Sequence, residues 1–284
     1  MKTLFFLSFL SPLLASAQNF YFSGRMGIAS YQGDLKAKNI SLSQSKIFAS
    51  AGAKYDLSEH IAVRGYFSLG ALEGDDSRGT PKMQQRNLRF QTNIWEWEGT
   101  VQYDLFSLNS RWWTPYVAGG IGLFHFNPFT TDSAGNKVFL QPLSTEGQGV
   151  IAGVKKYHRL QFFIPVGLGM ERALGENVRL GVEAGYRKLF TDYLDDVSNR
   201  YADQNLLLNS RGTKAVAFAY RGDEVGASPY PAAGTIRGSN KYKDSYFYFA
   251  FTLTIRHVFD KSREMTGLPA VKKEKKVGCP ATRN

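Results

Sequence analysis

The chain has 284 residues, a single cysteine, 14% aromatic residues and a formal net charge of +11. This length favours one domain, and the lone Cys279 excludes an internal disulfide framework. The positive charge would suit nucleic acid, but the N-terminus predicts export. An exported chain rarely meets nucleic acid, so we expect no such partner.

The first residues have the pattern of a secretory signal peptide. Lys2 precedes an apolar run from Leu4 to Leu14, and Ala15-Ser16-Ala17 follows as a small-residue cleavage site. Residues 1–17 are therefore the predicted signal peptide. The alternative, a membrane anchor, needs about 20 apolar residues, more than this run provides. No later stretch approaches that length, so inner-membrane helices are not expected.

Alternation of apolar and polar residues predicts eight β-strands. The last of them has Phe247, Phe249 and Phe251 on one side. Its other side carries polar residues and ends in Arg256. The predicted strands are 20–31, 46–57, 61–72, 94–105, 113–126, 160–173, 178–188 and 245–259.

Short turns alternate with long connections, of which the longest are 73–93, 127–158 and 189–244. This pattern predicts an all-β protein, an eight-stranded antiparallel transmembrane β-barrel of the outer-membrane type over residues 18–260. Long loops would be extracellular and both chain ends periplasmic. Trp95 and Trp97 are expected near the outer interface, and Trp112 and Trp113 near the periplasmic one. Residues 214–220 offer a further short strand, so ten strands is the alternative count.

A small barrel has room inside only for its own side chains or one small ligand. Unpaired charges there would be costly, so we expect an ion-pair network that fills the lumen. An ion path is the alternative interpretation. The charged residues with inward parity are Arg25, Lys54, Arg64, Glu96, Glu98, Glu171, Arg179, Glu183, Arg187 and Arg256.

No motif for a metal site, a cofactor or a serine hydrolase occurs, so we expect no cofactor and no enzyme. A His/Ser/Asp set assembled across loops is the alternative. Asp192, Asp195 and Asp196 offer oxygen ligands for calcium, but their spacing is not that of an EF-hand loop. We favour a hydrogen-bonded turn there. The tripeptide 221–223, Arg-Gly-Asp, occurs in some adhesive loops, and a three-residue match is close to chance.

Residues 261–284 form a basic segment with little to bury, which predicts an extended periplasmic tail. A lone cysteine in an exported protein is either a free thiol or a partner in an intermolecular bond. We expect this tail to bind a periplasmic partner, covalently or electrostatically. The residues that would do so are Cys279, Lys272, Lys273, Lys275 and Lys276.

Five short motifs follow one another along residues 20–202. They are YQGDL at 31–35, FNP at 126–128, TEGQG at 145–149, PVGLG at 165–169, and GYR at 185–187 followed by TDYLDDVS at 191–198. In this order and spacing the chain resembles the PorG-like outer-membrane barrels of the Bacteroidetes type IX secretion system.

The resemblance implies a non-enzymatic component of a protein-export machine in the outer membrane. Its partners would be membrane lipids and the periplasmic ring of PorK and PorN, with a disulfide at Cys279 as one means of attachment. The machine exports proteins with C-terminal sorting domains and, in some species, supports gliding. The alternative is a free-standing small barrel that acts in adhesion or envelope integrity through its extracellular loops.

Overall fold

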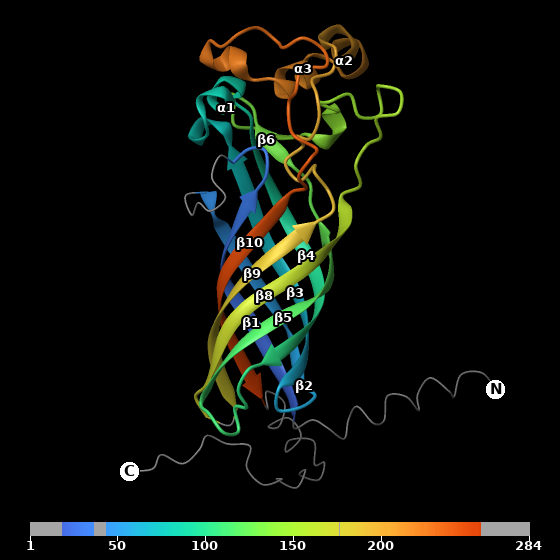
Figure 1. Ribbon diagram of the computed structural model, residues 1–284. Coiled ribbons are helices and arrows are strands. Elements are labelled where there is room, and N and C mark those ends of the chain that lie inside the picture. The colour runs from blue at the N-terminus through green and yellow to red at the C-terminus, as the bar shows by residue number, and fades with distance from the viewer. Residues whose placement is uncertain (1–18, 37–43, 176, 257–284) are drawn as a thin grey trace, which may run out of the picture.

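Eight long antiparallel strands close into a barrel in the computed structural model, which describes residues 19–36, 44–175 and 177–256 (Figure 1). Each strand pairs with its neighbours in chain order, and β1 pairs with β10 to close the sheet. The predicted eight-stranded fold is confirmed. The strands are β1 (Phe20–Gln32), β2 (Lys46–Asp56), β3 (Ile61–Asp75), β4 (Arg89–Asp104), β5 (Trp113–His125), β8 (Leu160–Ala173), β9 (Val178–Leu189) and β10 (Ser245–Arg256).

The barrel has two different ends. Short connections such as 57–60 and 105–112 lie at one end, which we call the turn end, and β1 begins and β10 finishes there. Residues 33–36 and the connections 76–88, 126–159 and 190–244 lie at the other, the loop end, at the top of Figure 1. Which side of the membrane each end faces stays a prediction.

Side chains alternate between the two faces of the wall, as a period of two requires. In β4 this alternation is complete along all 16 residues. Trp97 is 59% exposed on the outer surface, whereas Glu96 beside it is 0% exposed. Trp95 stacks on His125 toward the loop end, and Trp112 lies at the turn end. The outer surface is thus apolar and the interior polar, which suits a lipid surround.

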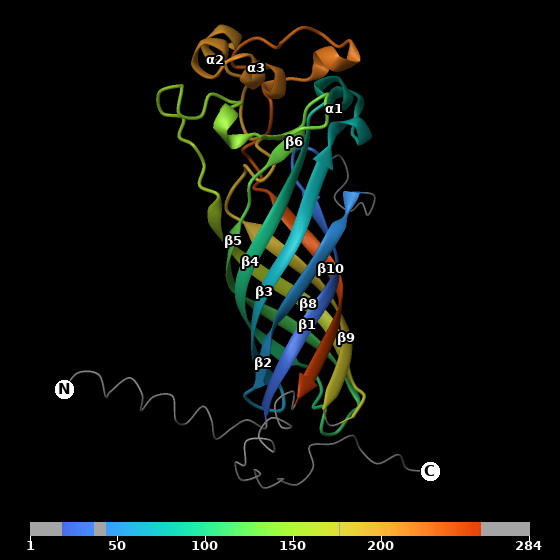
Figure 2. The ribbon, with the colours of Figure 1, turned by 180° about the vertical axis from the view of Figure 1, so that it is seen from behind.

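Two strands run further toward the loop end than predicted, as the view from behind shows (Figure 2). β3 continues to Asp75 and β4 begins at Arg89, so the predicted polar connection 73–93 is wrong at both ends. In β4 the reason is that inward-facing Phe90 joins a buried apolar cluster, and β3 pairs alongside it as far as Asp75. Between the strands lie the short helices η4 (Asp76–Arg78) and α1 (Pro81–Arg86).

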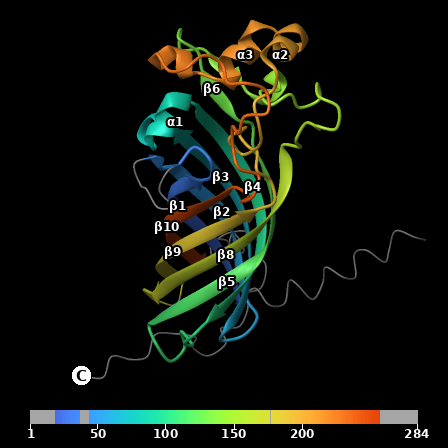
Figure 3. The same cartoon turned by 45° about the horizontal axis from the view of Figure 1, so that its top comes forward.

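The remaining elements form a cap over the loop end, seen with its top brought forward in Figure 3. The hairpin β6 (Phe129–Thr131) and β7 (Lys137–Phe139) joins β4 through the pair Gln91–Phe129. The helices are η5 (Gln141–Leu143), α2 (Gln204–Arg211), α3 (Thr213–Ala219) and η6 (Gly222–Val225). None of the helices in the described part of the chain is both long and apolar enough to cross a membrane.

The predicted extra strand at 214–220 is wrong, because these residues lie mostly in α3. Ala215 and Ala219 are four residues apart and share one helix face. Both are buried against Leu207 of α2. Gly212, with φ of 83°, makes the sharp join between the two helices. The short strands that the sheet does gain are β6 and β7.

Two glycines on the neighbouring strands β4 and β5 differ in how closely the adjacent backbone approaches them. A Cβ added at Gly120 would lie 2.0 Å from the backbone oxygen of Gly99, whereas one added at Gly99 would meet nothing within 4 Å. We expect Gly120→Ala to destabilise the barrel by about 1–3 kcal/mol through overpacking. Gly99→Ala should be close to neutral. Urea unfolding of the refolded barrel, followed by heat-modifiable migration on gels, measures both, and equal midpoints would contradict the prediction.

Candidate functional site

Buried charges from four strands meet in the middle of the lumen. Arg25 of β1 contacts Glu98 of β4 at 2.7 Å and Glu183 of β9 at 2.9 Å. Arg64 of β3 reaches the other oxygen of Glu183 at 2.6 Å. All four side chains are at most 3% exposed. Because these residues are up to 158 positions apart, only the closed sheet brings them together.

A second group lies on the same interior face. Arg187 of β9 donates to Glu96 at 3.1 Å and also forms an ion pair with Glu98. The hydroxyl of Tyr246 donates to the other oxygen of Glu96. Each of these carboxylates therefore holds at least two donors, which is what burial of a charge demands.

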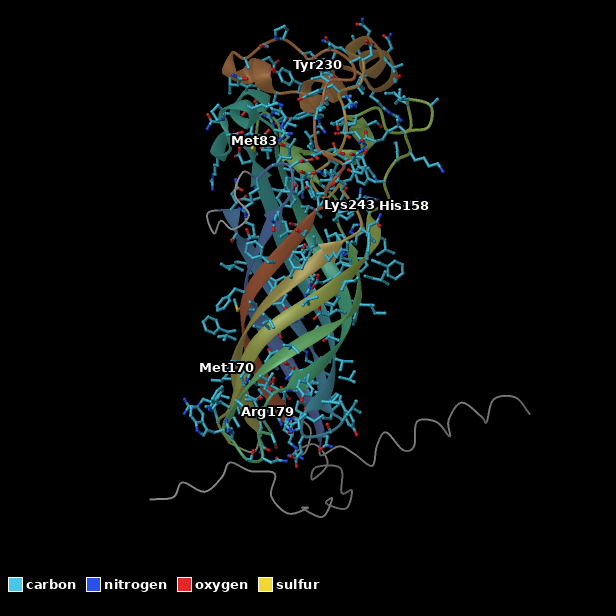
Figure 4. All side chains as sticks on the ribbon, viewed as in Figure 1. Met83, His158, Met170, Arg179, Tyr230 and Lys243 are labelled. Carbon is cyan, nitrogen blue, oxygen red and sulfur yellow. The ribbon has the colours of Figure 1, made fainter. Side chains whose placement is uncertain are left out.

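A third group fills the lumen nearer the turn end. Lys54 forms an ion pair with Glu171 at 2.6 Å, and Arg179 pairs with Asp56 at 2.9 Å. Asp104 lies 4.0 Å from the Lys54 ammonium. Figure 4 shows Arg179 at this end of the barrel. The sequence prediction did not include Asp56 and Asp104 in the network, although both lie on the inward parity of their strands.

Tyrosines complete the coordination of these charges. The hydroxyls of Tyr116 and Tyr248 both donate to Glu183, the former at 2.7 Å. The guanidinium of Arg25 lies 3.8 Å from the ring centre of Tyr66, a cation–π distance. The lumen is thus filled by paired and hydrogen-bonded side chains.

Arg256 differs from the expectation that it joins the network. It is the last residue of β10, at the turn end, and its guanidinium lies 5.7 Å from the ring centre of Tyr21. Its Nε is buried and has no hydrogen-bond partner among residues 19–36, 44–175 and 177–256.

Toward the loop end the inward side chains become apolar. Phe48 and Phe163 of the wall are at most 1% exposed, and Leu194 and Val197 of the following connection pack into the same cluster. The ring of Phe124 meets that of Phe163 edge to face at 5.9 Å. An apolar layer therefore closes the lumen above the charges.

Buried acidic groups bind the cap to this layer. Asp196 accepts hydrogen bonds from the hydroxyls of Thr145, at 2.5 Å, and Tyr157, at 2.8 Å. Burial raises the pKa of Asp196 to about 6, although Arg237 nearby opposes the rise. Burial likewise raises the pKa of Asp192 to about 7.

Glu146 is the second acidic anchor of the cap. Its Oε1 accepts from the backbone N–H of Ser198 at 2.9 Å and from the guanidinium of Arg237 at 3.0 Å. Arg237 also donates to the carbonyl of Asp196 at 2.6 Å. Glu146 of connection 126–159 thus binds both halves of connection 190–244, one through Ser198 and the other through Arg237.

The third anchor involves two carboxyl groups and a tyrosine. The Tyr31 hydroxyl lies 2.5 Å from Asp195 and 3.2 Å from Asp244, and Asp244 accepts from the backbone N–H of Leu194 at 2.9 Å. Burial raises the pKa of both carboxyls well above the ordinary range, and their neighbouring carboxyls add to the effect.

The calcium alternative has no support in this geometry. Asp192 accepts from Ser198, Asp195 from Tyr31 and Val197, and Asp196 from other residues, so the three carboxylates have separate partners. Within residues 19–36, 44–175 and 177–256 no group of three His, Cys, Asp or Glu side chains is placed to hold a metal ion. The backbone N–H of Val197 donates to Asp195 at 2.9 Å, which makes the favoured turn.

The Arg-Gly-Asp tripeptide is held within the cap. Arg221 is 2% exposed, and its guanidinium pairs with Glu224 at 2.7 Å and donates to Thr130 at 3.1 Å. An arginine so occupied is not available to an external adhesion receptor.

A family model for the outer membrane protein beta-barrel domain matches residues 3–211 of this sequence. The chain belongs to this family. As an outer-membrane barrel, the protein is placed in the bacterial outer membrane. Comparison with curated proteins gives no significant match.

Solved structures similar to this outer-membrane barrel include Neisserial surface protein A, at 11% identity and a TM-score of 0.42, with 84% of this chain and 97% of that chain covered. Ail of Yersinia pestis, in complex with the heparin analogue sucrose octasulfate, is 8% identical with a TM-score of 0.39. The match covers 84% of this chain and 98% of that chain. The outer membrane enzyme PagL is 13% identical with a TM-score of 0.32, and the match covers 82% of this chain and 97% of that chain. At these TM-scores we carry no activity over from them.

The predicted partner-binding residues of the outer-membrane barrel, Cys279, Lys272, Lys273, Lys275 and Lys276, lie outside the described residues. The predicted signal peptide 1–17 and tail 261–284 do so as well. These expectations stay predictions.

The charge network predicts a large cost for removing one shared carboxylate. Glu183→Gln would leave Arg25 and Arg64 buried with reduced compensation, so we expect a loss of about 3–5 kcal/mol in the free energy of unfolding. Glu73→Gln is the matched control, because Glu73 pairs with Lys46, whose side chain is 38% exposed, and a solvent-accessible pair contributes about 0–1 kcal/mol. Urea unfolding of the refolded barrel measures both, and similar losses would argue against the network.

The buried carboxyls of the cap predict a dependence on pH. A carboxyl whose pKa is raised on folding binds its proton more tightly in the folded state, so its contribution to stability is full at acidic pH. It is lost as the pH rises through the folded pKa, about 6 for Asp196 and about 7 for Asp192. We expect hydrogen-exchange protection of residues 190–199 to fall between about pH 5 and pH 8, relative to the strands.

The Asp196→Asn protein, which carries no titrating group there, should show a smaller pH dependence in the same measurement. Asp223→Asn, at an exposed position, serves as the control and should behave like the unaltered protein. Protection of 190–199 that rises with pH would contradict the assignment.

Proposed function

We propose that the protein is a non-enzymatic structural component of a type IX secretion machine, contacting a periplasmic ring of the PorK and PorN kind. The observation that carries this proposal is the sealed lumen. Ion pairs such as Arg64–Glu183 fill its middle, and Phe48, Phe163 and Leu194 close it toward the loop end. A barrel filled in this way acts through its ends and its outer surface.

The positions of the family-like motifs support the proposal. TEGQG supplies Thr145 and Glu146, and TDYLDDVS supplies Asp196 and Ser198, which bind one another. YQGDL supplies Tyr31, which donates to Asp195 of the TDYLDDVS segment. Residues of YQGDL, TEGQG and TDYLDDVS therefore meet in the closure of the lumen, whereas PVGLG and GYR lie on the wall strands β8 and β9.

A non-enzymatic role agrees with the places of the histidines in the described structure. His60 Nδ1 is 2.8 Å from the carbonyl of Asp104, and His125 stacks on Trp95 on the outer surface. His158 is exposed at the loop end. His60 lies at the turn end, whereas His125 and His158 lie at the loop end, so the three do not form a common catalytic group.

A second candidate function, adhesion or envelope integrity through the loops, is favoured by apolar side chains on the cap. Leu206 and Leu208 of α2 are each 39% exposed, and Tyr242 is 72% exposed. Such residues offer contact area to a partner at the loop end.

The two candidates predict opposite results for two variants. If the protein is a component of the secretion machine, removal of residues 261–284 should abolish secretion of sorting-domain proteins. It should also abolish co-purification of a ring lipoprotein from detergent-solubilised outer membranes. The variant Leu206→Ser with Leu208→Ser should leave both unchanged. Under the second candidate the cap variant should lose function and the truncated chain should keep it.

The same purification on non-reducing and reducing gels tests the covalent attachment. A high-mass band that collapses on reduction and is absent from the Cys279→Ser protein would support a disulfide to the partner. A barrel that purifies alone under gentle detergent, with secretion intact after truncation, would refute the proposed machine.

A further inference from the structure

Charge on one side of the barrel is unevenly distributed between its interior and its surface. Among the described residues of 137–190, the carboxylates are Glu146, Glu171 and Glu183, and all three are buried. They are engaged inside the molecule, with Arg237, Lys54 and the two lumen arginines Arg25 and Arg64. The exposed charge of this stretch is therefore cationic.

The cations are concentrated in segment 155–159, Lys-Lys-Tyr-His-Arg. Its centre, Tyr157, is fixed: the ring stacks on Phe126 at 5.9 Å, and the hydroxyl donates to Asp196. The four residues that flank Tyr157 are all exposed. A buried anchor thus holds two basic side chains on either side of it toward solvent.

The lipid-facing wall begins directly after this segment. On β8, Leu160 is 51% exposed, Phe162 64% and Ile164 37%, and all three are on the outer face. Lys188 of β9 is exposed on the same face and pairs in register with Ile164. In Figure 4, His158 lies where the barrel wall gives way to the cap. This is the level at which an outer-membrane barrel meets lipid headgroups.

We propose that these cations form a binding surface for the phosphate groups of membrane lipids in the leaflet at the loop end. The surface, which we call the basic rim, consists of the cations Lys155, Lys156, Arg159 and Lys188, with His158 between them. Ammonium and guanidinium groups bind phosphate through charge-assisted hydrogen bonds. The apolar side chains of β8 lie directly beneath, where the acyl chains of the same lipid would run. This continuity favours a lipid over a soluble acidic partner.

The opposite wall provides the contrast. There Lys46 of β2 is paired with Glu73 of β3 at 2.8 Å, so a cation at a comparable position is already compensated. Among the described residues of 137–190, every carboxylate is buried, so none compensates the basic rim. The inference does not depend on the proposed role in secretion.

The test uses the full chain, folded in detergent micelles, and native mass spectrometry to obtain an apparent dissociation constant. The probes are diphosphorylated lipid A and the same lipid after removal of both phosphates. We expect the unaltered protein to bind the phosphorylated form at least about tenfold more tightly, given roughly 1 kcal/mol per basic residue near a membrane surface. The variant Lys155→Gln, Lys156→Gln, Arg159→Gln should lose that preference.

The control removes the same charge from the cap helices, as Lys82→Gln, Arg211→Gln, Lys214→Gln, all at exposed positions on α1, α2 and α3. It should keep the preference, and heat-modifiable migration checks that both variants are folded. A rim variant that retains the preference would overturn the proposal. So would equal binding of the two lipids by the unaltered protein, or displacement of the lipid by inorganic phosphate at equal phosphate concentration.

Discussion

The closed barrel depends on the pairing of charges inside it. Period-two strands that place tryptophan and valine toward lipid must place their alternate residues in the lumen, and in this chain many of those are charged. Burial of such groups is tolerated only when each has a counter-charge and hydrogen-bond donors. Glu183 meets this condition through Arg25, Arg64 and Tyr116. Because its partners come from β1, β3 and β5, the network favours closure of the whole sheet.

The loop end is an extension of the barrel interior. The charged middle of the lumen passes into an apolar layer that Leu194 and Val197 complete from above. Buried carboxyls then join connection 190–244 to connection 126–159, where Thr145 and Tyr157 hold Asp196, and to β1 through Tyr31. Burial raises the pKa of Asp196 to about 6 and that of Asp192 to about 7, so we expect the cap to respond to pH near neutrality. The cap therefore packs like a small core, and its stability depends on buried carboxyls that ionise as the pH rises.

Because its interior is filled, the protein acts through its surfaces. The outer wall is apolar, its rim at β8 and β9 is basic, and α2 presents leucines at the far loop end. Each of these surfaces suits a different neighbour, namely acyl chains, lipid phosphates and a protein partner. A structural role in the outer membrane is consistent with all three, because none of them requires passage through the lumen.

The sequence by itself determined the strands and which side chains face inward. Alternation along the strand was enough to place Glu96 and Glu98 on the inner face and Trp95 and Trp97 on the outer face, since alternation is a local property of an extended chain. Tertiary structure decided the rest. Which cation meets which carboxylate depends on the register of the closed sheet, so Asp56, which the prediction left out, joins the network through Arg179. Residues 214–219 became helical because Ala215 and Ala219 pack against Leu207, a contact that no local pattern specifies.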